Sequence, residues 1–478
     1  SSAASDVYKR QILMGKGIPD MSNNKRINIA YIGGGSYNFG WKLFSELAAE
    51  EICATINLYD KDKQLSLTNE VIGNNLRDNP RCKSDIVFLA CDTPADALKG
   101  ADIVLMSIGC GNNDDETALH TIIEKYGIIQ TSGAQTGPVG IINALRILPD
   151  HIRYAEMIKN YCPDAWVINL SDPMSECINI MMKVFPEIKI FGSTNELFQT
   201  LEFIGGLVET ENGVTNIRRR DIKYNLMGIS GFSWFDKISY DGEDIMPIFR
   251  KYAEKFYKTG YELHPGEYKT NPLSSANKVK FDLFLRYGLI PAVSDRTIAE
   301  FCPPWYLKSK KTIENWKFSG SAVNYNKKLS IDRQGRVKPL MSGSESLAVG
   351  GYTSDVVLQI RALIGNGNLI TNACKKNNGQ ISNLPKNAIV SSNALISKNN
   401  VQTVTSGELP DELAAIAIRH ISNQNTIVRS VLVKDLDIAF NAFLNDPLVC
   451  IDLDNAGELY KEMLSAVSKD LVYFADIN

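Results

Sequence analysis

Short apolar runs alternate with longer segments of helical periodicity from residue 27 onward. The runs are rich in β-branched residues and too continuously apolar to keep one face in water, which is typical of parallel strands covered by helices on both faces. The pattern therefore predicts an α/β protein with a doubly wound, mostly parallel sheet of the Rossmann type. The predicted strands are residues 27–32, 55–60, 85–90, 102–109, 166–171 and 188–193.

The rhythm changes after about residue 200. Residues 223–244 alternate between apolar and polar positions as antiparallel strands do, and long helical segments follow at 276–287, 344–364 and 411–444. This part of the chain predicts a second domain of the α+β class.

Three divisions of the chain follow from these patterns. Residues 1–20 have neither the apolar centre of a signal peptide nor a helical period, so they are interpreted as a non-native or disordered leader. Residues 21–200 are predicted to form a nucleotide-binding domain, and residues 201–478 a substrate-binding and oligomerisation domain.

The composition and charge of the chain indicate a small-molecule partner. With 51 basic and 54 acidic residues the formal charge is −3, which gives no field for nucleic acid or an anionic membrane. There is no apolar run of about 18 residues that would span a bilayer. Nine unpaired-looking cysteines indicate reduced thiols and a cytoplasmic protein, and only four histidines argue against catalysis by a histidine cluster.

A glycine-rich turn follows the first predicted strand. Gly33 and Gly35 can turn sharply and let the backbone approach a pyrophosphate, and Ser36 and Tyr37 lead into a helix whose N-terminus favours anions. Asp60, at the end of the second strand, can accept hydrogen bonds from ribose hydroxyls and would repel a 2′-phosphate. The turn predicts NAD as cofactor; the alternative is a tight turn without a ligand.

Eight short sequence blocks, spread over nearly the whole chain after Met21, occur in the order that a known family has. Together they resemble glycoside hydrolase family four, the NAD-dependent glycosidases, and most closely its α-galacturonidase and α-glucosidase branches. The blocks are IGGGS (32–36), NLYD (57–60), QTGPVGIINALRILP (135–149), VINLSDPMS (167–175), FGSTNELF (191–198), GISGFSW (228–234), YGLIPAVSDRTIAEF (287–301) and NNGQISNLP (377–385).

The resemblance implies a redox mechanism that differs from hydrolysis by two carboxylates. Bound NAD takes hydride from C3 of the sugar, a base removes the acidified C2 proton, and the glycosidic oxygen leaves by elimination. Water then adds and the hydride returns. The resemblance also implies a divalent cation, usually manganese, on the C2 and C3 oxygens.

The metal ligands that the resemblance implies, a cysteine and a histidine, are replaced by Thr194 and Gly231, which are a poor ligand and a non-ligand. Asp172 and Glu196 can supply oxygen ligands to a relocated hard cation. The alternatives are a helix cap for Asp172 and an ordinary first-turn acid for Glu196.

The remaining candidates follow from the same blocks. Tyr287 is interpreted as the base for the C2 proton and Asp295 as a second catalytic residue, while Arg296 can grip a uronate carboxylate by a bidentate bond. Asp172 and Asn195 are predicted to bind substrate. A packed aromatic is the alternative for Tyr287, and an ion pair for the Asp295–Arg296 dipeptide.

Asn169 ends a predicted parallel strand, where such sheets bind ligands, and is predicted to contact the cofactor. The chain is thus predicted to be an NAD-dependent glycosidase acting on an α-linked hexoside or uronide, as a homodimer or homotetramer. The alternatives are a catalytically inactive NAD-binding sugar sensor and a metal-free NAD-dependent sugar dehydrogenase.

Overall fold

The computed structural model describes residues 26–351 and 353–475. Contacts divide them into unit 1, which comprises 26–102 and 336–351, and unit 2, which comprises 103–335 and 353–475. The predicted leader, residues 1–20, lies outside the described residues. Residue 200 falls inside unit 2, so the functional division into 21–200 and 201–478 stays a prediction.

Unit 1 is built on three parallel strands in the order β1-β2-β3. Ile27 lies opposite Ala54, and Cys53 opposite Asp85, so the strands end at one common edge. All residues of β1 except Asn28 are buried, as expected for a strand covered on both faces. The elements of unit 1 are β1 (Ile27–Ile32), α2 (Phe39–Ala48), β2 (Cys53–Tyr59), α3 (Lys63–Asn75), η1 (Leu76–Asp78), β3 (Asp85–Ala90) and α4 (Pro94–Leu98).

Unit 2 contains a second parallel group. In it, β5 pairs with β4 on one side and with β6 on the other, and Trp166 lies opposite both Ile103 and Lys189. These strands are fully or almost fully buried. Their bounds are Ile103–Met106 for β4, Trp166–Asn169 for β5 and Lys189–Gly192 for β6.

The sheet of unit 2 continues through antiparallel strands. β6 pairs with β11 at Gly192 and Cys374, and the order continues as β11-β12-β7-β8-β10. The β7–β8 hairpin confirms the antiparallel strands predicted for residues 223–244. The bounds are β7 (Ile222–Ile229), β8 (Phe232–Tyr240), β9 (Glu243–Asp244), β10 (Ile290–Pro291), β11 (Leu369–Lys376), β12 (Ile389–Ser397) and β13 (Asn400–Thr403).

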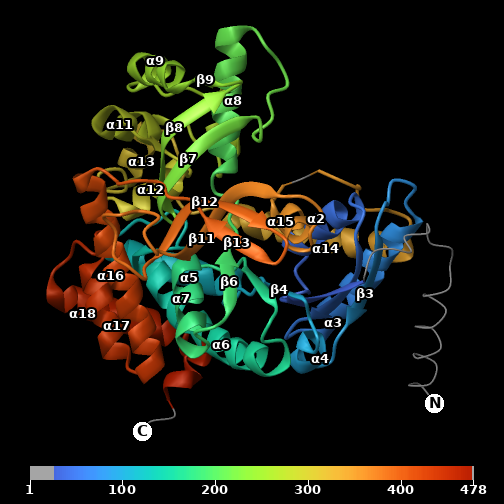
Figure 1. Cartoon of the computed structure of the whole chain (residues 1–478). Coiled ribbons are helices and arrows are strands. Elements are labelled where there is room, and N and C mark those ends of the chain that lie inside the picture. The colour runs from blue at the N-terminus through green and yellow to red at the C-terminus, as the bar shows by residue number, and fades with distance from the viewer. Residues whose placement is uncertain (1–25, 352, 476–478) are drawn as a thin grey trace, which may run out of the picture. The chain divides into compact units, whose positions relative to one another are not determined.

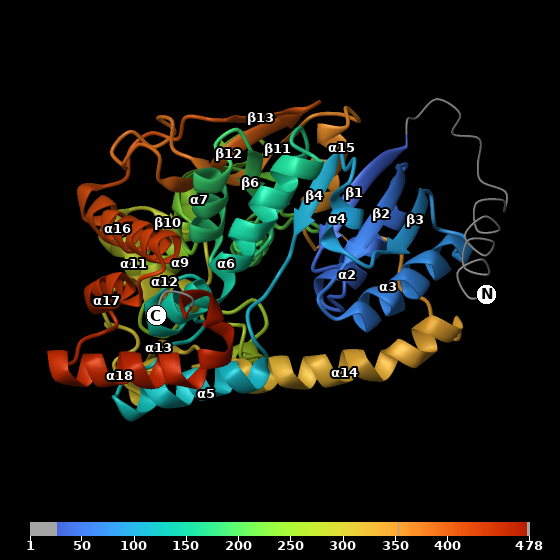
Figure 2. The same cartoon turned by 90° about the horizontal axis from the view of Figure 1, so that it is seen from below.

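Helices surround this sheet. Figure 1 shows α9 and α11 beside the β7–β8 hairpin, and Figure 2 shows α16 packed beside α6 and α7. The helices are α5 (Asn113–Lys125), α6 (Gly137–Tyr161), α7 (Met174–Val184), α8 (Phe198–Asn212), α9 (Met246–Phe256), α10 (Glu267–Thr270), α11 (Lys278–Tyr287), α12 (Asp295–Phe301), α13 (Lys310–Trp316), α14 (Val323–Ser342, which continues into unit 1), α15 (Val356–Leu363), α16 (Asp411–Val433), α17 (Leu436–Asn445), α18 (Leu453–Ala466), η2 (Ser468–Asp470) and η3 (Val472–Phe474).

Parallel strands flanked by helices, followed by an α+β region, confirm the predicted fold class. Two helical predictions need correction. The segment predicted at 411–444 is two helices, because Lys434 adopts a left-handed conformation between them. Of the segment predicted at 344–364 only α15 is helical, and Gly350 and Gly351 before it have positive φ. Within the described residues, no helix is long and apolar enough to cross a membrane.

Candidate active site

The glycine-rich turn of unit 1 is held close against the second strand. The N–H groups of Gly33 and Gly34 both donate to the Tyr59 carbonyl at 2.9 Å, and Gly33 has a φ of 87°. A Cβ on Gly35 would lie 2.6 Å from the Leu65 Cβ, so a side chain does not fit there. The turn therefore offers bare backbone just before α2, the arrangement that accommodates a pyrophosphate.

Asp60 directly follows β2 and faces this turn. Its Oδ2 accepts the N–H of Gly35 at 3.0 Å and its Oδ1 accepts the N–H of Asp62 at 3.0 Å. Burial raises the pKa of Asp60, while these two hydrogen bonds lower it. The structure thus brings the predicted acidic residue and the glycine turn together. The predicted contact of Asp60 with ribose stays a prediction.

The other predicted residues of the turn make local contacts. Ser36 Oγ accepts the N–H of Phe39 at 3.2 Å, close to the start of α2. The half-buried Tyr37 ring stacks on Trp41 with centroids 5.0 Å apart. This turn fits a dinucleotide, because the glycines carry no side chain and leave the N-terminus of α2 accessible.

A pair of carboxylates in unit 2, bridged by an amide, forms what we call the acidic centre: Asp172, Glu196 and Gln135. Asp172 follows β5 and forms a cis peptide bond with Pro173, and Glu196 follows β6. The Nε2 of Gln135 donates to Asp172 Oδ1 at 2.5 Å and to Glu196 Oε1 at 3.2 Å. Because parallel strands end at one edge of a sheet, residues that follow neighbouring strands meet there.

Two backbone groups complete the acidic centre. The N–H of Met174 donates to Gln135 Oε1 at 3.2 Å, which orients the amide so that its NH₂ group faces the carboxylates. The N–H of Gly231 donates to Glu196 Oε2 at 3.0 Å. Asp172 and Asn195 are exposed, so the centre is open to solvent on that side.

The electrostatics of the acidic centre favour protonation. Desolvation by the surrounding protein, and after it the charge of the Glu196 carboxylate, raise the pKa of Asp172 to about 7, although part of the side chain is exposed to solvent. Burial also raises the pKa of Glu196, against hydrogen bonds from Gly231 and Gln135 that lower it. Raised pKa values in neighbouring carboxyls are a common property of catalytic sites.

Glu176, in the first turn of α7, lies behind this centre. Burial and then the Asp172 charge raise its pKa to about 8. Asn169 is fully buried, and its Nδ2 donates to the Ser171 carbonyl at 3.0 Å and toward Met174 Sδ at 3.2 Å. Asn169 therefore shapes the turn after β5, and its predicted cofactor contact stays a prediction.

The two positions expected to hold the metal ligands do not fit a cation. The Thr194 Oγ1 accepts the N–H of Glu196 at 3.2 Å. A Cβ on Gly231 would lie 2.5 Å from the Phe301 ring, and the φ of Gly231 is 78°. A histidine is excluded there, and the NH₂ group of Gln135 occupies the space between the two carboxylates. Among the described residues, no group of three or more His, Cys, Asp or Glu could hold a metal ion.

Tyr287, Asp295 and Arg296 are placed mainly by internal contacts. Tyr287 ends α11 with its ring edge toward Trp234 at 6.2 Å, and burial raises its pKa. The fully buried Asp295 accepts the N–H groups of two residues in the first turn of α11 and lies 3.6 Å from Lys280 Nζ. Arg296, 7% exposed, donates to the carbonyl of Thr131. Their predicted catalytic and substrate-binding roles stay predictions.

Sequence reasoning missed the residue that joins the acidic centre. Gln135 lies inside a matched block, but its residue type alone indicates no chemistry, and the sequence suggests Glu196 only as a cation ligand or a first-turn helix acid. The signal available for Glu196 is its place shortly after a predicted parallel strand, near the carboxyl edge of the sheet that also pointed to Asn169.

Comparison with known proteins identifies the class. The profile described as Family 4 glycosyl hydrolase matches residues 28–209, and that of the Family 4 glycosyl hydrolase C-terminal domain matches residues 226–449. The chain belongs to this family and is a glycoside hydrolase.

Particular relatives sharpen the comparison. An alpha-galacturonidase of Thermoanaerobacterium saccharolyticum is 42% identical over 93% of this chain and 96% of its own length. An alpha-galacturonidase of Bacillus subtilis is 40% identical over 94% of this chain and 99% of its own. The solved structure of Bacillus subtilis lplD, 40% identical, superposes with a TM-score of 0.87 over 92% of this chain and all of that one.

The fold is also shared more widely. A 6-phospho-beta glucosidase from Thermotoga maritima, solved with manganese, NAD⁺ and glucose-6-phosphate, has a TM-score of 0.72 at 20% identity. It covers 93% of this chain and 99% of that one, and at this identity the likeness shows the fold alone.

Proposed function

We propose that this chain is an NAD-dependent α-galacturonidase. The observation that supports the substrate class most directly is the identity of 42% and 40% to two alpha-galacturonidases over more than nine tenths of each chain. The open face of the acidic centre, with Asp172 and Asn195 exposed, provides a place for the sugar.

The nucleotide turn of unit 1 supports NAD as cofactor. NAD supplies a hydride acceptor and donor, which is the chemistry needed at C3 of the sugar. The backbone of Gly33–Gly35 and the N-terminus of α2 would hold the pyrophosphate, and Asp60 would accept from the ribose hydroxyls. The Thermotoga maritima 6-phospho-beta glucosidase, which shares this fold, was solved in complex with NAD⁺.

The acidic centre provides the proton chemistry. With a pKa of about 7, Asp172 is protonated in a large fraction of molecules at neutral pH and can donate its proton to the leaving glycosidic oxygen. Burial, and after it the neighbouring charge of Glu196, which Gly231 and Gln135 hold in place, keeps the proton on Asp172. A proton retained by the pair also lowers its repulsion of a uronate carboxylate.

Three other predicted residues, Tyr287, Asn195 and Arg296, are proposed to act on or bind the sugar. Tyr287 stays the proposed base for the C2 proton, and Tyr287→Phe tests it. Asn195 is exposed beside the acidic centre and would contact the sugar. Arg296 stays the proposed contact for a uronate carboxylate. The proposal routes no step through a cation, because the donor set does not fit one.

The proposal is tested by hydrolysis of nitrophenyl α-galacturonide, with nitrophenyl α-glucoside and α-galactoside as comparison substrates. NAD is present or omitted, a thiol is included, and manganese is added in a separate arm. We expect release of galacturonate that requires NAD and prefers the galacturonide. Binding of NAD without turnover of any glycoside would favour a sugar sensor, and reduced nicotinamide accumulating with free galacturonate would favour a dehydrogenase; either result contradicts the proposal.

All nine cysteines are free in the structure. A further expectation concerns the oligomeric state. We expect a homodimer or homotetramer, which light scattering of the purified protein tests. A monomer at micromolar concentration would contradict this expectation.

A further inference from the structure

The loop that carries Gln135 is closed on itself. We call residues 130–137 the Gln135 loop. Gln130 joins its two ends, because its Nε2 donates to the Thr136 carbonyl at 2.6 Å and its Oε1 accepts the N–H of Val139 at 3.1 Å. At its centre Gly133 has a φ of 71°, and a Cβ there would lie 2.6 Å from Val139 Cγ1. A tight loop of this kind turns backbone N–H groups inward, and buried N–H groups need a hydrogen-bond acceptor. The loop holds one conformation only if such an acceptor is present.

Glu300 of α12 is that acceptor. Its Oε1 accepts the N–H and the hydroxyl of Thr131, both at 2.7 Å, and also the N–H of Ser132. Its Oε2 accepts the N–H of Gly133 at 3.2 Å and the Gln130 Nε2 at 3.2 Å. Three successive backbone N–H groups around one carboxylate form an anion-binding concavity, and Glu300 is only 2% exposed.

Other groups hold the C-terminal end of the loop to α12 and to Asp446, which follows α17. The carbonyl of Phe301 lies 2.8 Å from His420 Nε2, and His420 Nδ1 lies 3.1 Å from the Thr136 hydroxyl. Burial lowers the pKa of His420 to about 4, so the ring is neutral and donates from Nε2 to the carbonyl. The N–H of Gly137 donates to Asp446 at 3.1 Å.

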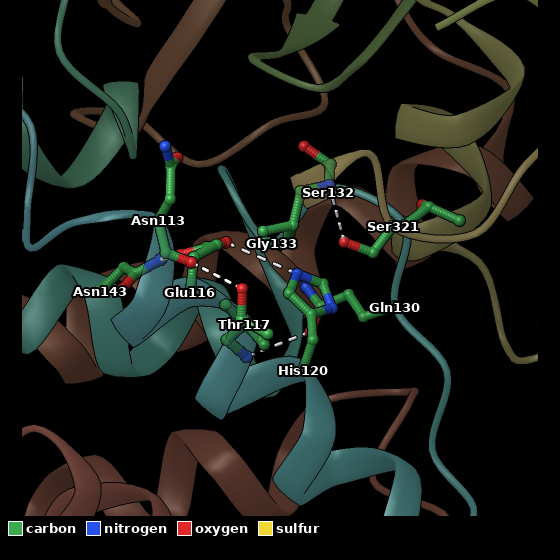
Figure 3. A network of polar contacts seen from close by, with 12 residues as sticks. Asn113, Glu116, Thr117, His120, Gln130, Ser132, Gly133, Asn143 and Ser321 are labelled. Atoms are coloured by element: carbon green, nitrogen blue, oxygen red, sulfur yellow. Dashed lines mark hydrogen bonds and ion pairs between the residues drawn. The ribbon is translucent and has the colours of Figure 1, made fainter. Parts of the chain in front are cut away.

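Other polar side chains lie beside the loop at Gly133. Figure 3 shows Glu116 and His120 of α5 and Asn143 of α6 beside the loop at Gly133. Glu116 lies 3.5 Å from His120 Nε2 and accepts from Asn143 Nδ2 at 3.3 Å. Glu300, by contrast, accepts hydrogen bonds from the backbone of residues 131–133.

We propose that Glu300 is a positioning residue: by binding the backbone of residues 131–133 it fixes the loop in which Gln135 bridges Asp172 and Glu196. Its consequence for catalysis rests on the proposed function of the acidic centre. Among the described residues, the hydrogen bonds of Glu300 go to residues 130–133 and not to Asp172 or Glu196, so it acts through Gln135.

The substitution Glu300→Gln tests this. It turns one acceptor oxygen into an NH₂ group that faces backbone N–H donors, so the loop has to move. Gln135 then no longer bridges the two carboxylates. Because the Gln135 hydrogen bond lowers the pKa of Asp172, its loss should raise that pKa further above about 7. A misplacement of this kind should lower kcat by about tenfold or more, with KM changed far less.

The decisive readout needs no substrate. The Asp172 carboxyl is titrated by infrared difference spectroscopy, assigned with Asp172→Asn, in wild type, Glu300→Gln, Gln135→Leu and the double variant. We expect both single variants to shift the titration upward by similar amounts and the double variant to shift it no further. Additive shifts, or an unshifted Glu300→Gln, would overturn the proposal.

Two further variants keep the test interpretable. Asp85→Asn removes a buried carboxylate that pairs with Arg26 in unit 1, and it should leave the Asp172 titration unchanged. If Glu300→Gln does not fold, Glu300→Asp keeps the charge but shortens the reach, and it should shift the titration in the same direction. An unshifted Glu300→Asp then counts against the proposal. Failure of the proposed function would show instead as a wild type inactive on galacturonides with the titration result intact.

Discussion

Replacing Gly35 with alanine places a methyl group where the nucleotide turn has no room. The new Cβ would lie 2.6 Å from Leu65 Cβ and 2.7 Å from Asp60 Oδ2, against an ordinary contact of 3.4–4 Å. One of these groups has to move by nearly 1 Å, and overpacking of this kind costs roughly 1–3 kcal/mol. The hydrogen bond from the Gly35 N–H to Asp60 is strained by the same movement, and a bond to a charged group contributes about 1.5–3 kcal/mol.

The same displacement should weaken NAD binding, because it alters both the pyrophosphate turn and the carboxylate proposed to hold the ribose. A loss of about 1.4 kcal/mol is a tenfold rise in Kd, and we expect at least that. Urea unfolding measures the stability change and titration calorimetry the affinity. Gly40→Ala is the matched control, since its Cβ would be 3.5 Å or more from its neighbours and alanine favours the helix. A Gly35→Ala variant as stable as wild type, with unchanged NAD affinity, would refute the reasoning.

Three further results are expected. Asp172→Asn should lower kcat by about 100-fold or more and abolish the decline of activity that wild type shows as pH rises through about 7, as measured in pH profiles; an unchanged profile would rule out Asp172 as the acid. Gly231→Ala should destabilise the fold by about 2 kcal/mol or more in urea unfolding, because it meets Phe301, whereas Gly213→Ala, with a similar φ and open space, should cost only about 1–2 kcal/mol; equal losses would contradict this. His420 has a folded pKa of about 4 against about 6.5 unfolded, so the unfolded chain binds more protons between these values and stability falls as pH falls from about 6.5 to about 4; His420→Gln should show a smaller fall over this range, and an equal fall would be evidence against it.

The strands of the parallel groups could be predicted because burial on both faces leaves a continuous apolar run, as in β1 and β3. The helix predicted at 344–364 failed because the apolar period continues across Gly350 and Gly351, whose positive φ values end any helix. A hydrophobic pattern carries no information about such a backbone turn when apolar residues such as Val349 continue up to the glycines.

One part of the candidate site could be predicted from the sequence and the other could not. The nucleotide turn is local in sequence, so Gly33, Gly35 and Asp60 could be recognised from their spacing after two strands. The acidic centre depends on Gln135, whose place is set by Glu300 more than 160 residues later in the chain. No spacing rule connects such residues, because the contact exists only once the sheet and α12 are in place.

The central claim is an NAD-dependent elimination at the sugar ring, and hydrolysis of an α-galacturonide in deuterated water tests it most directly. NAD is supplied, and the galacturonate formed is analysed by NMR before it exchanges. The account predicts deuterium at C2 of the product, because the C2 proton leaves to a protein base and solvent returns it, and no product without NAD. Galacturonate that keeps its original C2 hydrogen would contradict the account.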